Sequence, residues 1–392
     1  MTTYHHGVRV VEVTEGTRPI RTVNTAVVGI VGTAPSADAS VFPLNTPVLI
    51  AGSRTKAAKL DTLGTGLGTL PGSMDAIFDQ IAPMIVVVRV EEGADDAATQ
   101  SNIVGGVDAA GTFTGLQALL AAKTKVSMKP RIIGAPGFSH HQPIAAELAS
   151  IAEKLKAFTY VDCAAATAED AATFRNLLGS KRTMVLWPAF EVWSTSANGL
   201  VNLPASAIAL GLRAKTDNDI GWHKTLSNLP VNGVSGLTAD VDWDLQNPNT
   251  KAGYLNQNDI TTMIVQDGFR FWGSRTCSGD PKFAFESATR TGDILADTIA
   301  DGHMWAVDKP MSSVLITDIL EGINAKFRQL KAQGYIVDAN AYVDPEINGI
   351  ESIEAGQLWI NYDYTPVPPL EQLGFNAAIT NKYLVQLLPK AA

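Results

Sequence analysis

Short apolar runs alternate with helical patterns across the middle of the chain. Four segments carry apolar residues at the three- and four-residue spacing of a helix: Leu116–Lys123, Ile144–Phe158, Ala168–Leu178 and Ala205–Lys215. Three runs of strand-forming residues lie between them: Arg131–Gly134, Thr159–Cys163 and Thr183–Trp187. Three further runs precede this region: Val27–Val31, Val48–Ala51 and Met84–Val90. This alternation predicts βαβ units, and therefore an α/β body with a largely parallel sheet covered by helices on both faces.

The last third of the chain has a different pattern. The run Phe269–Phe271 alternates apolar and charged side chains, which predicts a strand with one buried face. A long helix is predicted over Ser312–Gln333, with Gly334 just past its end, where glycine is favoured. Leu358–Tyr364 alternates again and predicts a late strand. Thr216–Tyr254 has little periodicity and is interpreted as loops that join the α/β body to a second body of the α+β class.

Composition narrows the classes of function. The 392 residues are 46% hydrophobic and 18% charged, which suffices for sizeable cores. The net charge is −9, from 30 basic and 39 acidic residues, so we expect no nucleic-acid partner. Two distant cysteines, Cys163 and Cys277, favour a reducing compartment. The N-terminus lacks the apolar core of a signal peptide, and no apolar run is long enough for direct membrane insertion.

A hydrolase site is one interpretation of the predicted sheet. The carboxyl ends of parallel strands share one edge, which would bring together Ser139, His140, His141 and Asp162. Ser139 would be the nucleophile, either histidine the base, and Asp162 the residue that orients the base. The Gly-x-Ser-x-Gly turn that exposes such a serine is absent. Polar residues at strand ends are also ordinary loop composition, and we favour that interpretation.

A glycine-rich stretch, Leu63–Leu70, invites comparison with phosphate-binding loops. It does not follow a strand directly, and it lacks the Gly-Lys-Ser/Thr ending of those loops. A flexible loop is therefore the better interpretation. We identify no sequence motif for a metal or another cofactor, and we expect none to be bound.

Several short motifs, taken in order, resemble one family. The N-terminal half contains Gly7-Val8-Arg9-Val10-Val11-Glu12-Val13, Val31-Gly32-Thr33-Ala34-Pro35 and Ala135-Pro136-Gly137. The C-terminal half contains Leu255-Asn256-Gln257, Gly268, Trp272-Gly273-Ser274-Arg275-Thr276, Arg290 and the helix that ends at Gly334. In this order and spacing they are similar to contractile tail sheath proteins, the sheaths of contractile-tailed phages and R-type pyocins. The resemblance covers nearly the whole chain.

The resemblance implies a structural protein and not an enzyme. Sheath subunits of this family form six-fold rings that stack helically around a tail tube. They contract when the baseplate is triggered, and this drives the tube through the envelope of the target cell. The implied partners are further copies of the chain, the tail tube protein, and the baseplate and tail terminator proteins. The implied location is a virion tail or a released tail-like particle, assembled in the cytoplasm of the host bacterium.

The resemblance also implies a division into an outer and an inner body. The expected parts are an N-terminal arm at 1–25, an outer α/β body at 26–250, an inner α+β sheath core at 251–355 and a C-terminal arm at 356–392. The motif formed by Trp272, Gly273 and Arg275 would belong to the inner core.

Two strands are candidates for exchange between subunits. Val8, Val10 and Val13 mark an N-terminal strand that has no local partner in the sequence. Leu358, Ile360 and Tyr362 mark the C-terminal strand. In the sheath family, terminal arms add strands to the sheets of neighbouring subunits. Pairing of both strands inside their own subunit is the alternative that the sequence leaves open.

Basic residues gather at the end of the predicted helix Ser312–Gln333: Lys326, Arg328 and Lys331. Cations at a helix C-terminus interact favourably with the helix dipole, by about 0.3–1 kcal/mol each, which is a purely structural explanation. In the sheath family a helix at this place attaches the subunit to the inner tube, partly through charge. We therefore expect these three residues to contact the tube.

Overall fold

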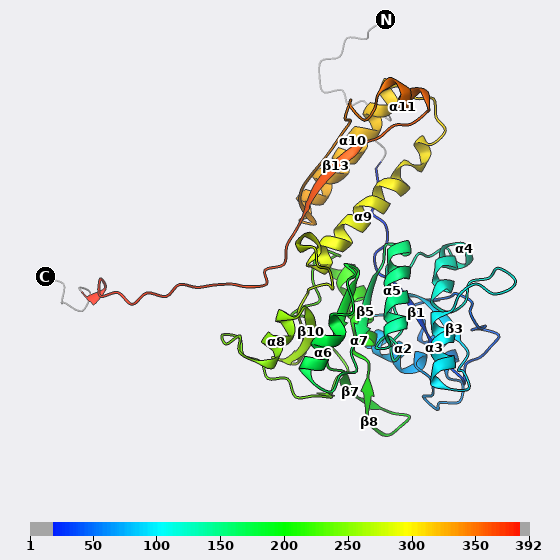
Figure 1. Cartoon of the computed structure of the whole chain (residues 1–392), viewed down its shortest axis with the longest axis vertical. Coiled ribbons are helices and arrows are strands. Elements are labelled where there is room, and N and C mark those ends of the chain that lie inside the picture. Colours follow the sequence, from blue (N-terminus) through cyan, green and yellow to red (C-terminus); the bar gives the residue numbers. More distant parts are fainter. Residues whose placement is uncertain (1–18, 385–392) are drawn as a thin grey trace, which may run out of the picture.

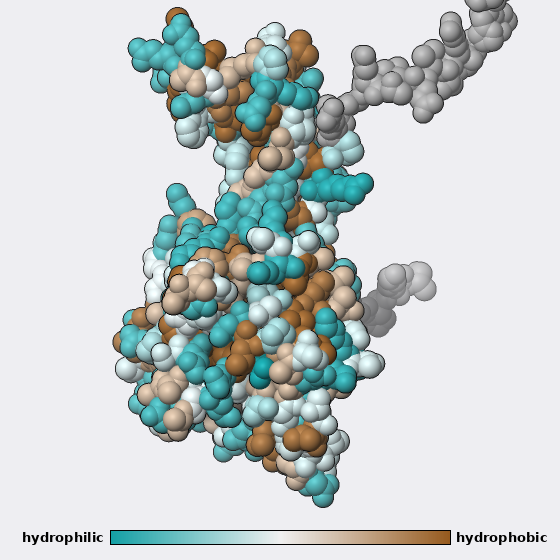
Figure 2. All heavy atoms as spheres, turned by 90° about the vertical axis from the view of Figure 1, so that its right-hand side faces the viewer, coloured by the Kyte–Doolittle hydropathy of each residue, from teal (hydrophilic) through white to brown (hydrophobic). Residues whose placement is uncertain are grey.

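A computed structural model describes residues 19–384 of the chain, which form two bodies and an extended segment (Figure 1). The large body is an eight-stranded sheet with helices on both faces. A smaller body, built from two long helices and a two-stranded sheet, stands on one side of it (Figures 1 and 2). The chain after the last strand leaves both bodies and runs out sideways (Figure 1).

The large sheet has the strand order β11-β10-β6-β5-β4-β1-β3-β2. Its central strands pair in parallel: β10 (Ile260–Val265), β6 (Thr183–Leu186), β5 (Phe158–Asp162), β4 (Ile132–Gly134), β1 (Val27–Thr33) and β3 (Met84–Val90). The two edge strands are antiparallel to their neighbours: β11 (Phe269–Trp272) and β2 (Val48–Ala51). The predicted class, an α/β body with a largely parallel sheet, is confirmed.

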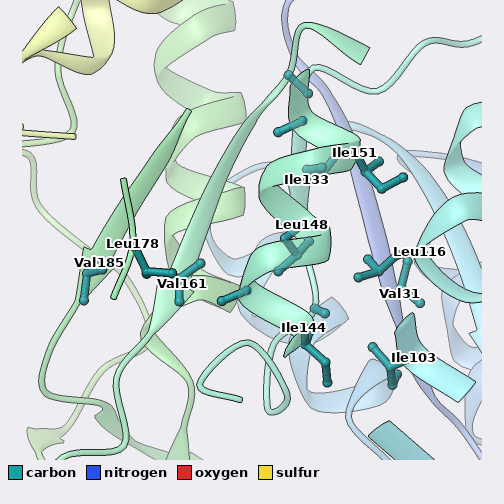
Figure 3. Close-up of a cluster of buried hydrophobic side chains, with 14 of the residues drawn as sticks. Val31, Ile103, Leu116, Ile133, Ile144, Leu148, Ile151, Val161, Leu178 and Val185 are labelled. Atoms are coloured by element: carbon teal, nitrogen blue, oxygen red, sulfur yellow. The ribbon is translucent and has the colours of Figure 1, made fainter. Parts of the chain in front are cut away.

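Helices cover both faces because the strands are apolar on both sides. One face packs on α2 (Leu70–Gln80) and α7 (Ala205–Asp219). The other packs on these segments: α3 (Asp96–Val104), η2 (Gly115–Ala121), α4 (Ala122–Val126), α5 (Gln142–Leu155), α6 (Ala168–Arg175) and α8 (Lys251–Gln257). Figure 3 shows the centre of this second layer, where Ile144, Leu148 and Ile151 of α5 are fully buried. Each such side chain contributes about 1.5–3 kcal/mol by leaving water.

The large body also contains several short elements outside its eight-stranded sheet. They are α1 (Arg54–Ala57), η1 (Ala58–Leu60), the three-stranded sheet of β8 (Gly199–Leu203), β7 (Phe190–Ser194) and β9 (Gly236–Leu237), and η3 (Pro281–Phe283). Among residues 19–384, no helix is both long and apolar enough to cross a membrane.

The small body consists of α9 (Glu286–His303), α10 (Ser313–Ala332), β12 (Ile336–Tyr342) and β13 (Asn361–Pro366), with η4 (Met304–Ala306) and α11 (Ile350–Glu354) at its tip. The predicted start and end of α10 are confirmed. The Ser312 hydroxyl accepts a hydrogen bond from the backbone N–H of Leu315 at 3.1 Å, and Gly334 adopts φ +78° beyond the last turn. A separate core joins α9, α10 and the strands through Ile294, Ile323 and Phe327.

The division of the bodies differs from the expected boundary at residue 250. Strands β10 and β11, expected in the inner body, belong to the large sheet because β10 pairs with β6. The preceding loops also hydrogen-bond to the large body. The side chain of Gln80 donates to the carbonyl of Asn232 at 2.9 Å, and Thr238 donates its N–H to Ala189 O at 3.0 Å. The small body therefore begins near Glu286.

Candidate assembly interface

The last strand, β13, pairs inside its own chain. It forms an antiparallel pair with β12, and Tyr362 packs on Phe327 of α10 with ring centroids 5.9 Å apart. Leu358 and Ile360, also predicted for the exchanged strand, precede β13. The predicted strand exists, but Tyr362 lies on a local sheet. The segment that leaves the body begins only after Pro366, later than the expected residue 356.

The edges of the small sheet differ from the β11 edge of the large sheet. The outer edge of β11 is covered, because Asn228 and Val231 donate backbone N–H groups to Phe271 and Phe269 at 2.8 and 2.9 Å. In contrast, the two-stranded sheet of β12 and β13 has no third strand among the described residues. A two-stranded sheet is an incomplete unit, and open edges can accept further strands. The small sheet is thus a candidate acceptor for a strand from elsewhere.

Residues 367–384 form an extended segment with apolar side chains in water. Leu373, Phe375 and Ile379 expose 63%, 85% and 107% of their reference areas. Together with Ala377 they alternate with polar or small residues, which is the pattern of a strand with one apolar face. No residue from 372 to 384 forms a hydrogen bond or ion pair with the described remainder of the chain. This segment has the features of a strand that lacks its sheet.

The tip of the small body also exposes apolar side chains. They include Met304, Val307, Val314, Ile350 and Trp359, each more than half exposed. Figure 2 shows hydrophobic surface on the small body, next to hydrophilic surface. Large exposed apolar patches on a protein surface commonly mark sites of interaction with other molecules.

The three basic residues of α10 do not form one patch. Lys326 is buried, its ammonium donates to Gln329 Oε1 at 3.0 Å, and burial lowers its pKa. Lys331 is paired with Asp338 at 2.5 Å. Arg328 is 66% exposed and lies 3.7 Å from Glu321, and the Lys331 side chain is 52% exposed. The exposed part of the expected cluster therefore consists of Arg328 and Lys331, each beside an acidic partner.

The N-terminal residues Val8, Val10 and Val13 lie outside the described residues. The chain from Pro19 onward starts beside the small body. Ile20 is buried against α9, where a Cβ at Gly302 would lie 2.7 Å from the Ile20 side chain. Val23 donates its N–H to the hydroxyl of Thr298 at 3.4 Å. The chain thus passes the small body before it enters the large sheet at β1.

Buried ion pairs fasten the small body to the large one. Arg290 of α9 binds both carboxylate oxygens of Asp217 on α7, with one contact of 2.8 Å. Arg213 binds the same carboxylate at 2.7 Å, and Tyr160 of β5 donates to Glu286 at 2.7 Å. All five side chains are buried. This cluster ties the first turns of α9 to a central strand of the sheet.

A second set of ion pairs extends this joint along α9. Asp297 forms ion pairs with Lys129 at 2.7 Å, with Lys156 at 3.0 Å, and with Arg131. Burial raises the pKa of Asp297, but the three cations outweigh burial and hold its pKa well below the usual range. One turn earlier, Asp293 binds Arg182 of the large body. The first half of α9 is therefore fixed to the large body at several points.

The motif around Gly273 is a structural corner. Gly273 has φ +133°, and a Cβ there would lie 2.9 Å from the Cα of Thr261. The side-chain amide of Asn256 donates to the carbonyls of Ile260 and Trp272, at 3.0 and 2.9 Å. The corner redirects the chain from the large sheet toward Arg275, which lies on the surface beside the C-terminal segment.

Backbone amides of the glycine-rich stretch bind the carboxylate of Asp61, which lies just before the stretch. Asp61 accepts backbone N–H groups from Thr65 at 3.1 Å and Gly66 at 2.6 Å. The hydrogen bond from Gly66, more than the others, lowers the pKa of Asp61. The amides that a phosphate would need are already occupied, which supports the interpretation as a loop.

The hydrolase hypothesis is not supported by the geometry at the sheet edge. Ser139 and Asp162 do meet, as the shared edge predicts, but Ser139 is fully buried and donates directly to Asp162 at 2.7 Å. Ser206 donates a hydroxyl and an N–H to the same carboxylate at 2.5 and 2.8 Å. Burial, opposed by these bonds, raises the pKa of Asp162. No hydrogen bond joins His140 or His141 to Ser139 in the part of the chain that the structure describes.

We expect Ser139→Ala to act on stability alone. It removes one donor from a buried carboxylate, so the free energy of unfolding should fall by about 1–3 kcal/mol in urea titrations. Ser101→Ala on the exposed side of α3 is the control, with a change within about 0.5 kcal/mol. Labelling of Ser139 by a fluorophosphonate would contradict this interpretation.

The sequence matches three family models. They are the tail sheath protein Gp18 domain III N-terminal region at residues 25–90, the phage tail sheath protein central domain at 111–277, and the phage tail sheath C-terminal domain at 278–380. The central-domain match ends after β11, which agrees with the place of β10 and β11 in the large sheet.

Similar proteins span the whole chain. The tail sheath protein of Escherichia phage P2 is 51% identical, covering 99% of this chain and 98% of that protein. The major tail sheath protein of Serratia phage KSP20 is 42% identical, with 97% and 96% covered. The fold resembles the contracted sheath complex of PVC, an extracellular contractile injection system, with a TM-score of 0.72, 16% identity and 97% and 99% covered.

The fold and these full-length similarities define a structural subunit of a contractile tail or tail-like particle. The chain belongs to the phage tail sheath protein family. Its similar proteins are sheath proteins, which points to a structural protein and away from catalysis.

Proposed function

We propose that this subunit polymerises helically around a tail tube and contracts to drive the tube through the envelope of a target cell. The proposal rests on two features of the same subunit that each lack a partner: a two-stranded sheet and an extended apolar segment. Within residues 19–384 the small sheet has no third strand, and residues 367–384 form a strand-like segment without a sheet. A second copy of the chain supplies what each feature lacks, so head-to-tail contacts generate rings and helices.

The C-terminal segment of one subunit adds to the β12–β13 sheet of a neighbour. Each backbone hydrogen bond so formed contributes about 0.5–1.5 kcal/mol net, and burial of Leu373, Phe375 and Ile379 adds to this. The N-terminal strand marked by Val8, Val10 and Val13 is proposed as a second exchanged arm. It would leave from the same body, because Ile20 is anchored there. The small body is thus the inner body that holds the lattice together.

Contraction draws its energy from assembly and not from a nucleotide. Arm contacts that persist in both states cancel in the free-energy difference between those states, so they keep subunits connected without driving the change. The driving force comes from surfaces that meet in one state only. We assign these to the outer α/β body.

The inner face of the polymer contacts the tube protein through α10. Its exposed stripe includes Val314, Glu321 and Arg328, so the contact combines apolar and charged groups. The further partners are baseplate and terminator proteins at the two tail ends. Six-fold rings, and assembly in the cytoplasm of a bacterial host, complete the proposal.

Arg328→Glu should reduce assembly around the tube several-fold without affecting folding. The side chain is exposed and its ion pair with Glu321 is weak, so stability should change by no more than about 0.5 kcal/mol. Co-sedimentation with purified tubes measures assembly, and circular dichroism checks the fold. Lys154→Glu, exposed on α5 of the large body, is the matched control. Equal loss in both variants would point to a general charge effect.

Negative-stain microscopy of the purified protein tests the proposal as a whole. A sheath subunit gives rings or tubes, whereas an enzyme of this size gives small globular particles. Tubes whose lumen excludes the tail tube protein would contradict the proposed partner.

A further inference from the structure

Among the described residues, a bidentate ion pair attaches the C-terminal segment at Glu371 before the segment runs out from the molecule. Glu371 receives two hydrogen bonds from Arg275, from Nε at 2.9 Å and from Nη2 at 2.7 Å. This is the two-pronged geometry in which an arginine fixes a carboxylate in direction as well as distance. Beyond Glu371, the described segment makes hydrogen bonds only within itself.

Arg275 is mounted on a rigid base. Its neighbours Ser274 and Thr276 are buried, and they join the start of α9 through a bond from Glu286 N–H to Ser274 O at 3.2 Å. The guanidinium lies 5.4 Å from the ring of Phe285, and 3.8 Å from Asp259. These contacts restrict the Arg275 side chain before Glu371 arrives.

The chain between β13 and Glu371 is stiff. Pro366 is the last residue of β13, and Pro368 and Pro369 follow it; their rings fix φ and favour an extended spacer. A stiff spacer held at its far end by a bidentate ion pair gives the next residues a defined starting point and direction. Without the ion pair, the same residues would sample many directions.

We propose that Arg275 is a positioning residue, a clamp that aims the C-terminal segment at the neighbouring subunit. This inference rests on the proposed exchange of that segment. The clamp makes no contact with the neighbour itself. It lowers the conformational entropy that the segment loses when it pairs, and so raises the effective concentration of the segment at the acceptor sheet.

The primary test measures the direction of the segment in the unassembled, full-length subunit. Spin labels on Lys282→Cys and Leu373→Cys report the distance across the clamp by pulsed electron resonance. The native Cys163 and Cys277 are buried and should not react. We expect a narrow distance distribution in the parent protein. Arg275→Ala and Glu371→Ala should each broaden it, and the double variant should be no broader than either single variant.

Two further variants separate positioning from loss of structure. Arg275→Lys keeps the charge but not the two-pronged geometry, so its distribution should be intermediate. Gln372→Ala, next to the clamp and exposed, should behave as the parent protein. Thermal midpoints should be unchanged in all of them. An unchanged distribution in Arg275→Ala overturns the clamp, whatever happens to assembly.

Assembly kinetics supply the second readout. In Arg275→Ala the rate of sheath formation should fall by about tenfold, with the final polymer unchanged in form, since the arm contacts themselves are intact. A broadened distribution with a parental assembly rate keeps the clamp but contradicts the proposed exchange of the segment. The two proposals therefore fail in distinguishable ways.

Discussion

We expect removal of residues 372–392 to abolish sheath formation and to leave the subunit folded. Residues 372–384, the part of this segment that the structure describes, are all exposed, so removing them takes away no core packing. The urea midpoint of the truncated subunit should therefore match that of the full chain. Assembly should fall below detection in sedimentation and microscopy, because the strand that would complete the neighbour's small sheet is gone.

Substitutions within the segment distinguish strand exchange from a mere spacer. Changing Leu373, Phe375 and Ile379 together to Ser removes one apolar face and keeps the backbone, and we expect nearly the same loss of assembly. The matched control changes the opposite face, with Asn376→Ser and Thr380→Ser, and should assemble normally. Normal sheaths from the truncated subunit would show that the open edges of β12 and β13 are completed by something else.

Local patterns of the sequence predict the elements well. The bounds of α10 follow from its apolar stripe, the Ser312 cap and Gly334, all of which act within a few residues. The meeting of Ser139 and Asp162 follows from parallel strands that end at one edge. The burial of Lys326 also had a signal, since it falls at helical spacing after Ile323. The position of Lys326 in the helix therefore outweighs its charge.

Contacts between distant residues have no such local signal. Arg275 and Glu371 are 96 residues apart, and Arg290 and Asp217 are 73 apart. The small body begins later than the expected residue 250 for a related reason. A loop-rich composition is typical of linkers, but here the loops bond back to the large body, and the chain continues the same sheet afterwards. Only the fold reveals which loops separate bodies.

The joint between the bodies should be among the most sensitive places in the subunit. Arg290→Met leaves Asp217 and Glu286 buried with Arg213 as their one arginine partner among the described residues. Breaking a buried ion pair from one side typically costs about 3–5 kcal/mol, because an uncompensated charge stays inside. We therefore expect the free energy of unfolding to fall by about that amount in urea titrations.

A second substitution tests whether charge imbalance is the cause. Asp217→Leu added to Arg290→Met removes one charge of each sign and leaves Arg213 with Glu286. Apolar replacements of buried pairs are often neutral or stabilising, so the double variant should recover most of the lost stability. If the double variant is as unstable as Arg290→Met, the loss arises from packing around Arg290 and not from its charge.

The same pair of variants shows what the joint does in the polymer. Since α9 is tied to the large body by Glu286, Arg290, Asp293 and Asp297, the two bodies should move together when subunits turn. A rotation caused by contacts between outer bodies is then transmitted directly to the inner bodies of the lattice. We expect sheaths of the recovered double variant to contract as the parent does, because the contacts of Asp293 and Asp297 remain. Sheaths that assemble but fail to contract when triggered would assign transmission specifically to the Arg290–Asp217 pair.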